Sequence, residues 1–216
     1  MSINYNPTIV QSGLVLYMDS MNRKSYSGSG TTWSDLVGGN IATLTNPVYN
    51  ADKSLAFNGT NAYATIPNNT KLDTQAPTVE VWMKTNALSQ NGFWFEKGSV
   101  NTEYSLFQEG GNIVWRQGGI SQYTTTASYL NTTQYFQIVG TYVSGSRNTY
   151  INGNLVTTDT ATGAVGVNGS GMTIGMYNSG GYLFNGNIAV VRVYSRVLTA
   201  SEVYQNFISC RGRFGL

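Results

Sequence analysis

Histidine is absent from this 216-residue sequence, and cysteine occurs only once, as Cys210. Without histidine, the chain has no Ser-His-Asp or Cys-His nucleophile, no imidazole metal ligand and no histidine pH switch. A lone cysteine can neither form an intrachain disulfide nor make a zinc site. We therefore expect a fold held by its own hydrophobic core, which a single domain of this length is large enough to bury.

Charged residues are also scarce. The 12 Lys and Arg and 10 Asp and Glu make up 10% of the chain, against about 25% in ordinary globular proteins. The net charge of +2 comes without a basic run, which argues against nucleic acid or a membrane surface as a partner. The sequence has no apolar run of membrane-spanning length, and its first residues do not resemble a secretory signal. We expect a chain made in a reducing cytoplasm.

Aromatic and turn-forming residues are abundant. The chain has 15 Tyr, 8 Phe, 4 Trp and 25 Gly, together with many Asn, Thr and Ser. The aromatic content excludes intrinsic disorder. The small polar residues suit turns and exposed strand faces better than helices. The composition predicts an all-β fold.

Short strand-like runs recur between turn clusters, which is typical of a sandwich or barrel. Asn152-Gly153 predicts a type I′ hairpin, because both residues adopt the positive φ values that this turn requires. In the run from Val79 to Met83, alternate residues point in opposite directions, and we expect one of the two faces to lie in the core. The clearest runs are Leu14 to Met18, Val79 to Met83, Phe93 to Phe95, Ile113 to Trp115, Phe136 to Tyr142, Thr149 to Ile151 and Ile188 to Tyr194.

One helix is expected near the end of the chain. Thr199 and Glu202 have capping-box spacing, and Val203, Tyr204 and Phe207 supply an apolar stripe. We interpret the last six residues as an ordinary solvated terminus. The expected organisation is an N-terminal arm (residues 1–12), one β-sandwich domain (13–210) and a C-terminal tail (211–216).

Eight segments follow one another with a characteristic order and spacing. They are Gly13-Leu-Val-Leu-Tyr-Met-Asp19, Trp33-Ser-Asp-Leu36, Phe57-Asn-Gly-Thr-Asn-Ala-Tyr63 with Ile66-Pro67, Thr78-Val-Glu-Val-Trp82, Gly140-Thr-Tyr142, Tyr150-Ile-Asn-Gly153, Ile174-Gly175, and Phe184-Asn-Gly-Asn-Ile188 leading to residues 191–202. Together they resemble the laminin-G-like jelly rolls of the concanavalin A-like lectin and glucanase superfamily. The resemblance spans nearly the whole chain and implies a two-sheet antiparallel β-sandwich with a short C-terminal helix.

The beginning and end of the chain are similar to versions of this domain carried by tailed bacteriophages, including those of cyanobacteria. The segments concerned are residues 26–33 and 211–216. The resemblance implies a non-enzymatic virion protein on the particle surface, made in the host cytoplasm. A capsid decoration or cement role is the first prediction, with capsid or other virion proteins and further copies of the chain as partners. The alternative is a carbohydrate-binding adhesin of a tail or head fibre, which recognises a host glycan.

Hydrolysis is the third hypothesis, since the superfamily includes retaining glucanases. Those enzymes place two or three carboxylates at alternate positions of one strand. The same-face neighbours of Glu80 are not acidic. Glu103 and Glu109 are six residues apart, roughly 20 Å along a strand, whereas catalytic carboxyl pairs lie about 5 to 9.5 Å apart. We therefore expect no enzymatic activity.

The resemblance makes calcium a candidate ligand, because many members of the superfamily bind it at the rim of the sandwich. The corresponding loop often carries two aspartates, and this chain has Asn58 and Ala62 in their places. Asp19, Asp35 and Asn61 remain as candidate oxygen ligands. The competing interpretation is that Asp35 and Asn61 cap turns. We expect no cofactor, with calcium at these three residues as the alternative.

A sugar site needs an aromatic platform and a few fixed polar groups. The sequence offers Trp94, Trp115, Tyr123 and Tyr129 as platforms, with Arg116 near them. The competing interpretation is that aromatic residues on strands mostly belong to the core.

Unpaired strand edges are the last expectation. Natural sequences protect such edges with lysine or proline, and both are scarce here. We expect neighbouring subunits or a capsid shell to cover some edges or flat faces. Residues 1–11 are a candidate anchoring arm.

Overall fold

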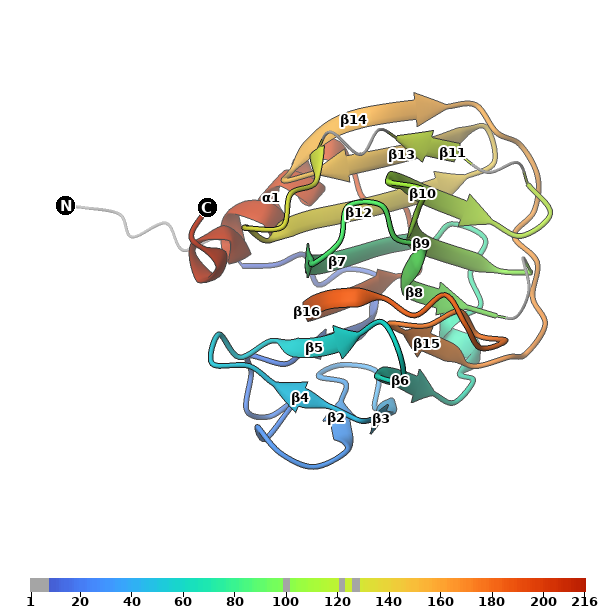
Figure 1. Ribbon diagram of the computed structural model, residues 1–216. Helices are drawn as coiled ribbons and strands as arrows, with labels where there is room; N and C mark the ends of the chain where they lie inside the picture. The colour runs from blue at the N-terminus through green and yellow to red at the C-terminus, as the bar shows by residue number, and fades with distance from the viewer. Residues whose placement is uncertain (1–7, 99–101, 121–122, 126–128) are drawn as a thin grey trace.

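The strands of this protein form two antiparallel sheets that pack face to face (Figure 1). The computed structural model describes residues 8–98, 102–120, 123–125 and 129–216, and within them each sheet has eight strands. Sheet A has the order β14-β13-β12-β7-β16-β5-β4, with β1 also paired to β16, and sheet B has the order β11-β10-β9-β8-β15-β6-β3-β2. The predicted all-β, two-sheet antiparallel sandwich is confirmed.

The strands are short, as the frequent turn clusters imply. Those of sheet A are β1 (Leu14–Asp19), β4 (Val48–Tyr49), β5 (Leu55–Asn58), β7 (Thr78–Thr85), β12 (Phe136–Val143), β13 (Ser146–Ile151), β14 (Asn154–Asp159) and β16 (Asn185–Tyr194). Those of sheet B are β2 (Thr32–Ser34), β3 (Ile41–Thr45), β6 (Tyr63–Ile66), β8 (Gly92–Lys97), β9 (Tyr104–Glu109), β10 (Asn112–Gln117), β11 (Tyr123–Thr125) and β15 (Met172–Ile174). All seven strand-like runs named from the sequence lie within these elements.

The hairpin predicted at Asn152-Gly153 joins β13 to β14. The two residues have φ values of 50° and 78°, the left-handed region that a type I′ turn requires. Ile151 pairs with Asn154 directly across the turn. The hairpin is therefore confirmed, and it sets the register of the β14 edge of sheet A.

Strand β7 is buried on both of its faces. Val79, Val81 and Met83 lie in the core between the sheets, as the alternation predicts. Glu80 and Trp82, on the opposite face, are also fully buried. This second burial was not expected, because alternation alone does not say what covers the outer face of a sheet.

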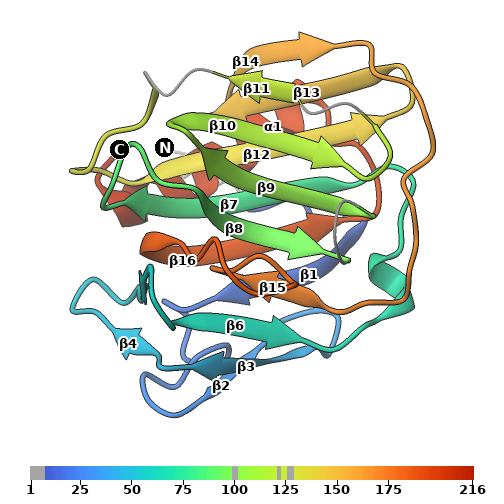
Figure 2. The ribbon, with the colours of Figure 1, turned by 45° about the vertical axis from the view of Figure 1, so that its right-hand side comes forward.

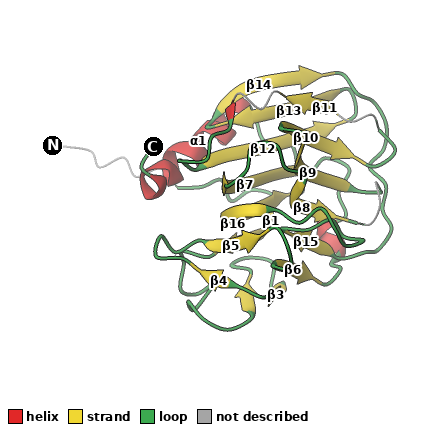
Figure 3. Cartoon of the chain, viewed as in Figure 1, coloured by secondary structure: helices red, strands yellow, loops and turns green. Residues whose placement is uncertain are grey.

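Helix α1 (Ala200–Cys210) provides part of that cover (Figures 1 and 3). Its capping box is present as predicted, since the Thr199 side chain accepts from the Glu202 backbone while the Glu202 side chain accepts from the Thr199 backbone. Val203 and Phe207 are buried in the clusters that lie on sheet A, whereas Tyr204 is exposed. The apolar stripe therefore joins the helix to the sheet.

The C-terminal tail provides the rest of the cover. It forms the 3-10 helix η3 (Arg211–Phe214), whose Phe214 ring stacks on Trp82 with the centroids 4.4 Å apart. The Arg213 guanidinium makes two hydrogen bonds to Asp19, at 2.6 and 2.9 Å. The expectation of a solvated tail is only partly correct: four of the six tail residues are exposed, but one aromatic ring and one cation find partners on sheet A that lie far away in the sequence.

Residues 8–12 of the predicted N-terminal arm also lie against α1. Val10 is buried, and its backbone N–H donates to Asn206 Oδ1 at 2.8 Å. Residues 1–7 lie outside the described residues. The anchoring role of the arm stays a prediction.

Candidate functional site

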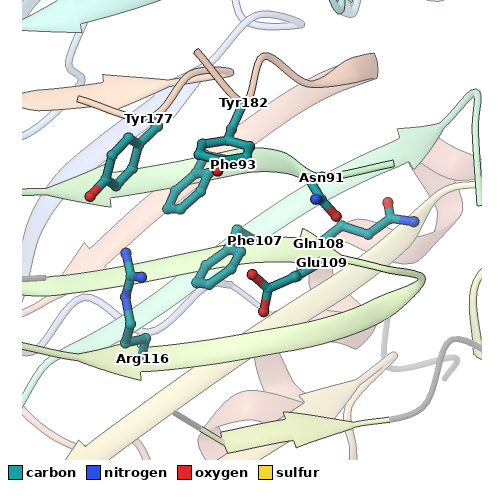
Figure 4. A pocket seen from close by; sticks show the side chains of 8 residues that line it. All are labelled: Asn91, Phe93, Phe107, Gln108, Glu109, Arg116, Tyr177 and Tyr182. Atoms are coloured by element: carbon teal, nitrogen blue, oxygen red, sulfur yellow. The ribbon is translucent and has the colours of Figure 1, made fainter. Parts of the chain in front are cut away.

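A small pocket lies on the outer face of sheet B, where no helix crosses the strands in Figure 2. It forms where β8, β9 and β10 meet the loop from residue 175 to 184, which joins β15 to β16. Its volume is about 180 Å³, less than the about 300–1,000 Å³ of pockets that enclose drug-sized ligands. Figure 4 shows the residues that line it: Asn91, Phe93, Phe107, Gln108, Glu109, Arg116, Tyr177 and Tyr182.

Two phenylalanine rings form the floor of the pocket. Phe93 of β8 and Phe107 of β9 are direct cross-strand partners, so their side chains leave the sheet on the same face. Their rings are stacked, with centroids 4.2 Å apart and planes 5° apart. Both residues are buried, and Val114 of β10 completes the cluster beside them. The floor is therefore a closely packed apolar surface with little exposure to solvent.

Two tyrosines of the 175–184 loop lie beside the floor. The Tyr177 and Tyr182 ring centroids are 4.8 and 6.3 Å from that of Phe93. Tyr182 has a φ of 43° and follows two glycines that also have positive φ, Gly180 and Gly181. A side chain in the left-handed region costs about 1–2 kcal/mol. The Tyr182 side chain is nevertheless 57% exposed, which makes it the most accessible aromatic ring of the pocket.

Arg116 lies at one end of the pocket, over the Phe107 ring (Figure 4). Its guanidinium carbon is 4.8 Å from the ring centroid, within cation–π range. Its Nε donates to Ser105 Oγ at 3.1 Å, and its Nη2 lies 3.4 Å from Glu96 Oε1. Burial lowers the pKa of Arg116, and the nearby carboxylates oppose this shift. These contacts hold the cation in place at the edge of the aromatic floor.

Glu96 lies behind Arg116, with only 2% of its side chain exposed. Its Oε2 accepts the backbone N–H of Asn178 at 2.5 Å. Burial raises the pKa of Glu96 to about 7, against the opposing effects of the Asn178 N–H and the Arg116 charge. The carboxyl therefore titrates near neutral pH.

The opposite end of the pocket carries Asn91 and Glu109. Figure 4 places Glu109 on the side of Phe107 away from Arg116. Asn91 Oδ1 accepts the Gly110 backbone N–H at 2.7 Å, which fixes its amide. A ligand lying on the aromatic rings thus meets a guanidinium at one end and an amide with a carboxylate at the other.

Of the five predicted sugar-binding residues, Arg116 lies in the pocket and the two tryptophans do not. Trp94 and Trp115 are fully buried between the sheets, so neither ring can stack on a sugar. Trp115 Nε1 donates to the Thr141 carbonyl, and its indole lies so close to Gly140 that a Cβ there would come within 2.3 Å. Both assignments are wrong, because these side chains point to the inner face of sheet B.

The two predicted tyrosines lie elsewhere. Tyr129 is exposed but does not line the pocket. Tyr123 pairs with Trp115 along β10 and β11, and its side chain lies outside the described part of the structure. The two pocket tyrosines, Tyr177 and Tyr182, were not predicted from the sequence. The only sequence signal near them was the loop-forming pair Gly180-Gly181.

The three candidate calcium ligands have separate hydrogen-bonding partners. Asp19 binds Arg213 and the Tyr17 hydroxyl. Asp35 accepts backbone N–H groups of its own turn, and Asn61 pairs with Asn58 in the turn that follows β5. Among the described residues, no three acidic or thiol side chains form a group that could hold a metal. The structure thus shows Asp35 capping its turn, whereas Asn58, rather than Asn61, caps the turn after β5 by accepting the N–H groups of residues 60–62.

The two carboxylates around the pocket are too far apart for glycoside hydrolysis. Glu96 pairs with Ser105 across β8 and β9, and Glu109 lies four residues further along β9. At about 3.3 Å per residue, this separation is about 13 Å along the strand. Retaining and inverting glycosidases need about 5 to 9.5 Å.

The fold and the exposed pocket define a jelly-roll domain of the lectin-like class. The family described as the concanavalin A-like lectin/glucanases superfamily, laminin G type, matches residues 58–204. This match covers more than half of the chain, and the protein therefore belongs to this superfamily. The family prediction from the sequence is confirmed.

Several solved structures share this fold at low sequence identity. The botulinum neurotoxin serotype D/C VPI 5993 binding domain has a TM-score of 0.71 at 15% identity, over 91% of this chain and 52% of that one. The binding domain of botulinum neurotoxin DC in complex with SialylT has a TM-score of 0.69 at 15% identity, over 91% and 51%. Trypanosoma rangeli sialidase in complex with sialic acid has a TM-score of 0.71 at 17% identity, over 96% and 34%.

The chain thus spans about half of the toxin domains and a third of the sialidase.

No curated protein matches the sequence. Helix length and hydropathy, checked over the described residues, reveal no helix suited to crossing a membrane.

Proposed function

We propose that this domain binds carbohydrate in the pocket between β8, β9, β10 and the 175–184 loop. The observation that carries the proposal is the exposed Tyr182 ring, held in a strained backbone conformation above an aromatic floor. Backbone strain persists where the surrounding structure enforces it, and it concentrates at binding sites. An exposed aromatic ring supplies the apolar surface on which the carbon face of a sugar ring stacks.

The polar groups of the pocket suit the hydroxyls of a sugar. Arg116 and Tyr177 lie on one side of the phenylalanine floor, and Asn91 and Glu109 lie on the other (Figure 4). A few fixed polar groups around an apolar surface are what orients a small ligand. The volume of about 180 Å³ favours a single terminal sugar ring over a long chain. The neurotoxin structure in complex with SialylT supports this proposal at the level of the shared fold.

The positions of the carboxylates favour sugar binding without hydrolysis. The separation of Glu96 and Glu109 exceeds that of a catalytic pair. Glu80 is fully buried beneath α1 and Trp82, away from the pocket.

A glycan array followed by calorimetry tests the proposal. We expect the wild-type protein to bind a defined set of glycans, and Tyr182→Ala to weaken binding at least about tenfold, because stacking surface is lost. Tyr204→Ala is the matched control, since Tyr204 is 51% exposed on α1, outside the pocket. Equal binding by both variants, or an array without hits, would contradict the proposal.

The resemblance to phage proteins extends this proposal to an adhesin on a virion. Capsid decoration is the second candidate function. It is supported by exposed apolar side chains on the two outer strands of sheet A, Val48 on β4 and Leu155 on β14. These strands have edges on which a second protein could dock. The copy number per particle separates the two roles, since hundreds of copies favour decoration and a handful favour an adhesin.

A further inference from the structure

A second and larger hollow lies beside the C-terminal tail, on the outer face of sheet A. It is lined by Tyr17 and Asp19 of β1, by the turn that follows β1, by Lys53, and by Arg213 of the tail. Tyr17 packs in the cluster around Trp82, which places the hollow on the outer face of this sheet. Its volume of about 620 Å³ lies within the range of about 300–1,000 Å³ that ligand pockets have.

The charge of this hollow is unusual for the chain. Arg23, Lys53 and Arg213 line it, together with one carboxylate among the described residues, that of Asp19. The lining therefore has a net charge of +2, as large as that of the whole chain. The three cations come from segments that lie far apart in the sequence. Because like charges repel one another, an anion bound among them would lower the energy of this arrangement.

Asp19 has no acceptor capacity left for the other two cations. Its Oδ1 accepts the Met21 N–H at 3.0 Å and Arg213 Nη2 at 2.6 Å. Its Oδ2 accepts the Tyr17 hydroxyl at 3.0 Å and Arg213 Nη1 at 2.9 Å. Four donors occupy the acceptor sites of a carboxylate. Asp19 thus holds the Arg213 guanidinium in place, and Arg23 and Lys53 keep their charge uncompensated by it.

The three cations retain donors that the protein does not use. Within the described parts of the chain, the Lys53 ammonium has neither a hydrogen-bond nor an ion-pair partner. Arg23 donates from Nη1 to the Ser27 carbonyl, and Arg213 uses two of its five N–H donors on Asp19. The remaining N–H groups of these side chains are available to a ligand.

The backbone of Lys53 is fixed although its side chain is exposed. Its φ is 65°, which is uncommon for residues other than glycine and asparagine. Its N–H donates to the Asn50 carbonyl at 2.9 Å, and its carbonyl accepts from Ser20 Oγ at 2.8 Å. The preceding residue, Asp52, does not line the hollow, and its carboxylate accepts the Tyr135 hydroxyl at 2.8 Å. The turn thus places an ammonium group at the hollow without a neighbouring carboxylate to pair with it.

We propose that this hollow is a second binding site, which takes an organic anion carrying two phosphate or sulfate groups. Each such group has at least three acceptor oxygens, which suits donors that arrive from three separate segments, whereas a carboxylate has only two. Two anionic groups match the net charge of the lining. The volume exceeds that of one such group, and the Tyr17 ring and Met21 offer apolar contacts to the rest of the ligand. The site lies on the opposite sheet from the sugar pocket, and the inference goes beyond the proposed function.

Calorimetry with pyrophosphate, the simplest compound with two phosphates, tests the site. We expect a Kd below about 1 mM at an ionic strength of about 0.15 M. Lys53→Asn should weaken binding at least about tenfold, because one contact between charged groups is lost while asparagine tolerates the left-handed backbone. Lys71→Asn is the matched control. It removes the same charge from an exposed position outside the hollow and should bind as the wild type does.

A disulfated disaccharide and its unsulfated parent distinguish the two anionic groups. Binding of pyrophosphate alone would assign the site to phosphates, and binding of the disulfated sugar alone would assign it to sulfates. The inference is overturned when neither anion binds, when both lysine variants weaken binding equally, or when the unsulfated sugar binds at this site as tightly as the sulfated one.

Tyr182→Ala keeps this test separate from that of the sugar pocket. Tyr182 lies on the other sheet, so this variant should bind pyrophosphate as the wild type does. Loss of glycan binding in Tyr182→Ala and loss of pyrophosphate binding in Lys53→Asn would establish two independent sites. Failure of either site leaves the other standing.

Discussion

The outer faces of the two sheets differ in how they are covered. On sheet A, helix α1 and the C-terminal tail lie over β7 and β16, so Trp82 and Glu80 are sealed from solvent. On sheet B, a loop of about ten residues lies beside Phe93 and leaves a pocket (Figure 4). The first face is closed over β7 and β16 by the protein itself, and the second remains accessible to a ligand.

Each face contains a buried glutamate beside an arginine, and the comparison between them is instructive. Glu80 accepts four side-chain hydrogen bonds at 2.8–3.0 Å, from Trp82, Gln137, Arg192 and Asn206. Glu96 has one backbone partner and a longer contact to Arg116. Burial raises the pKa of Glu96, and its two partners only partly oppose this effect. The first arrangement fastens helix α1 to sheet A, and the second leaves a buried carboxyl whose pKa is raised.

The largest expected effect on stability comes from a substitution on the covered outer face of sheet A. Arg192→Met removes the cation that lies 2.8 Å from Glu80 and leaves the buried carboxylate without a counter-charge. We expect the free energy of unfolding to fall by about 3–5 kcal/mol, measured by urea denaturation. The double variant Glu80→Leu with Arg192→Met should lose less, because no charge remains buried. A double variant worse than the single one would contradict this account.

Titration of Glu96 should give the next effect. Its pKa in the folded state, about 7, lies above the value of 4.5 for an ordinary glutamate, so the folded protein holds the proton more tightly. Stability is therefore expected to decrease by about 3 kcal/mol as the pH rises from about 4.5 to about 7, and then to stay level. Thermal or urea denaturation across this range measures it. Glu96→Gln should abolish the decrease, and Glu109→Gln should keep it.

Removal of the tail ring should have a smaller effect. Phe214→Ala deletes the ring stacked on Trp82, and we expect a loss of about 2 kcal/mol in the free energy of unfolding. The neighbouring Arg211 is exposed, so Arg211→Ala should change stability by less than about 0.5 kcal/mol. Equal effects of the two variants would show that the tail does not seal this face.

The smallest effect on stability is expected at the pocket on the outer face of sheet B. Tyr182→Gly removes an exposed ring from a left-handed position, where glycine is relaxed. The strain relieved and the flexibility gained by the unfolded chain roughly cancel, so the free energy of unfolding should stay within about 1 kcal/mol of the wild type. Glycan binding should nevertheless be lost. A large loss of stability would mean that Tyr182 is a structural residue.

The candidate site was only partly predictable from the sequence. Arg116 was identified because a sugar site needs fixed polar groups and this residue lies near candidate aromatic platforms in the sequence. Trp94 and Trp115 were equally plausible, and they are buried because their side chains point to the inner face of sheet B. Which face of a sheet becomes the inner one depends on how distant strands pair, and alternation within one strand does not contain this information.

The strands, the Asn152-Gly153 turn and the Thr199–Glu202 cap were determined by the sequence alone, because each depends on residues a few positions apart whose backbone preferences act locally. The cover over Trp82 and the pocket around Phe93 were decided only by the tertiary structure. Each of them brings together segments that lie more than 80 residues apart in the sequence. Contacts between such segments form only when the whole sandwich closes.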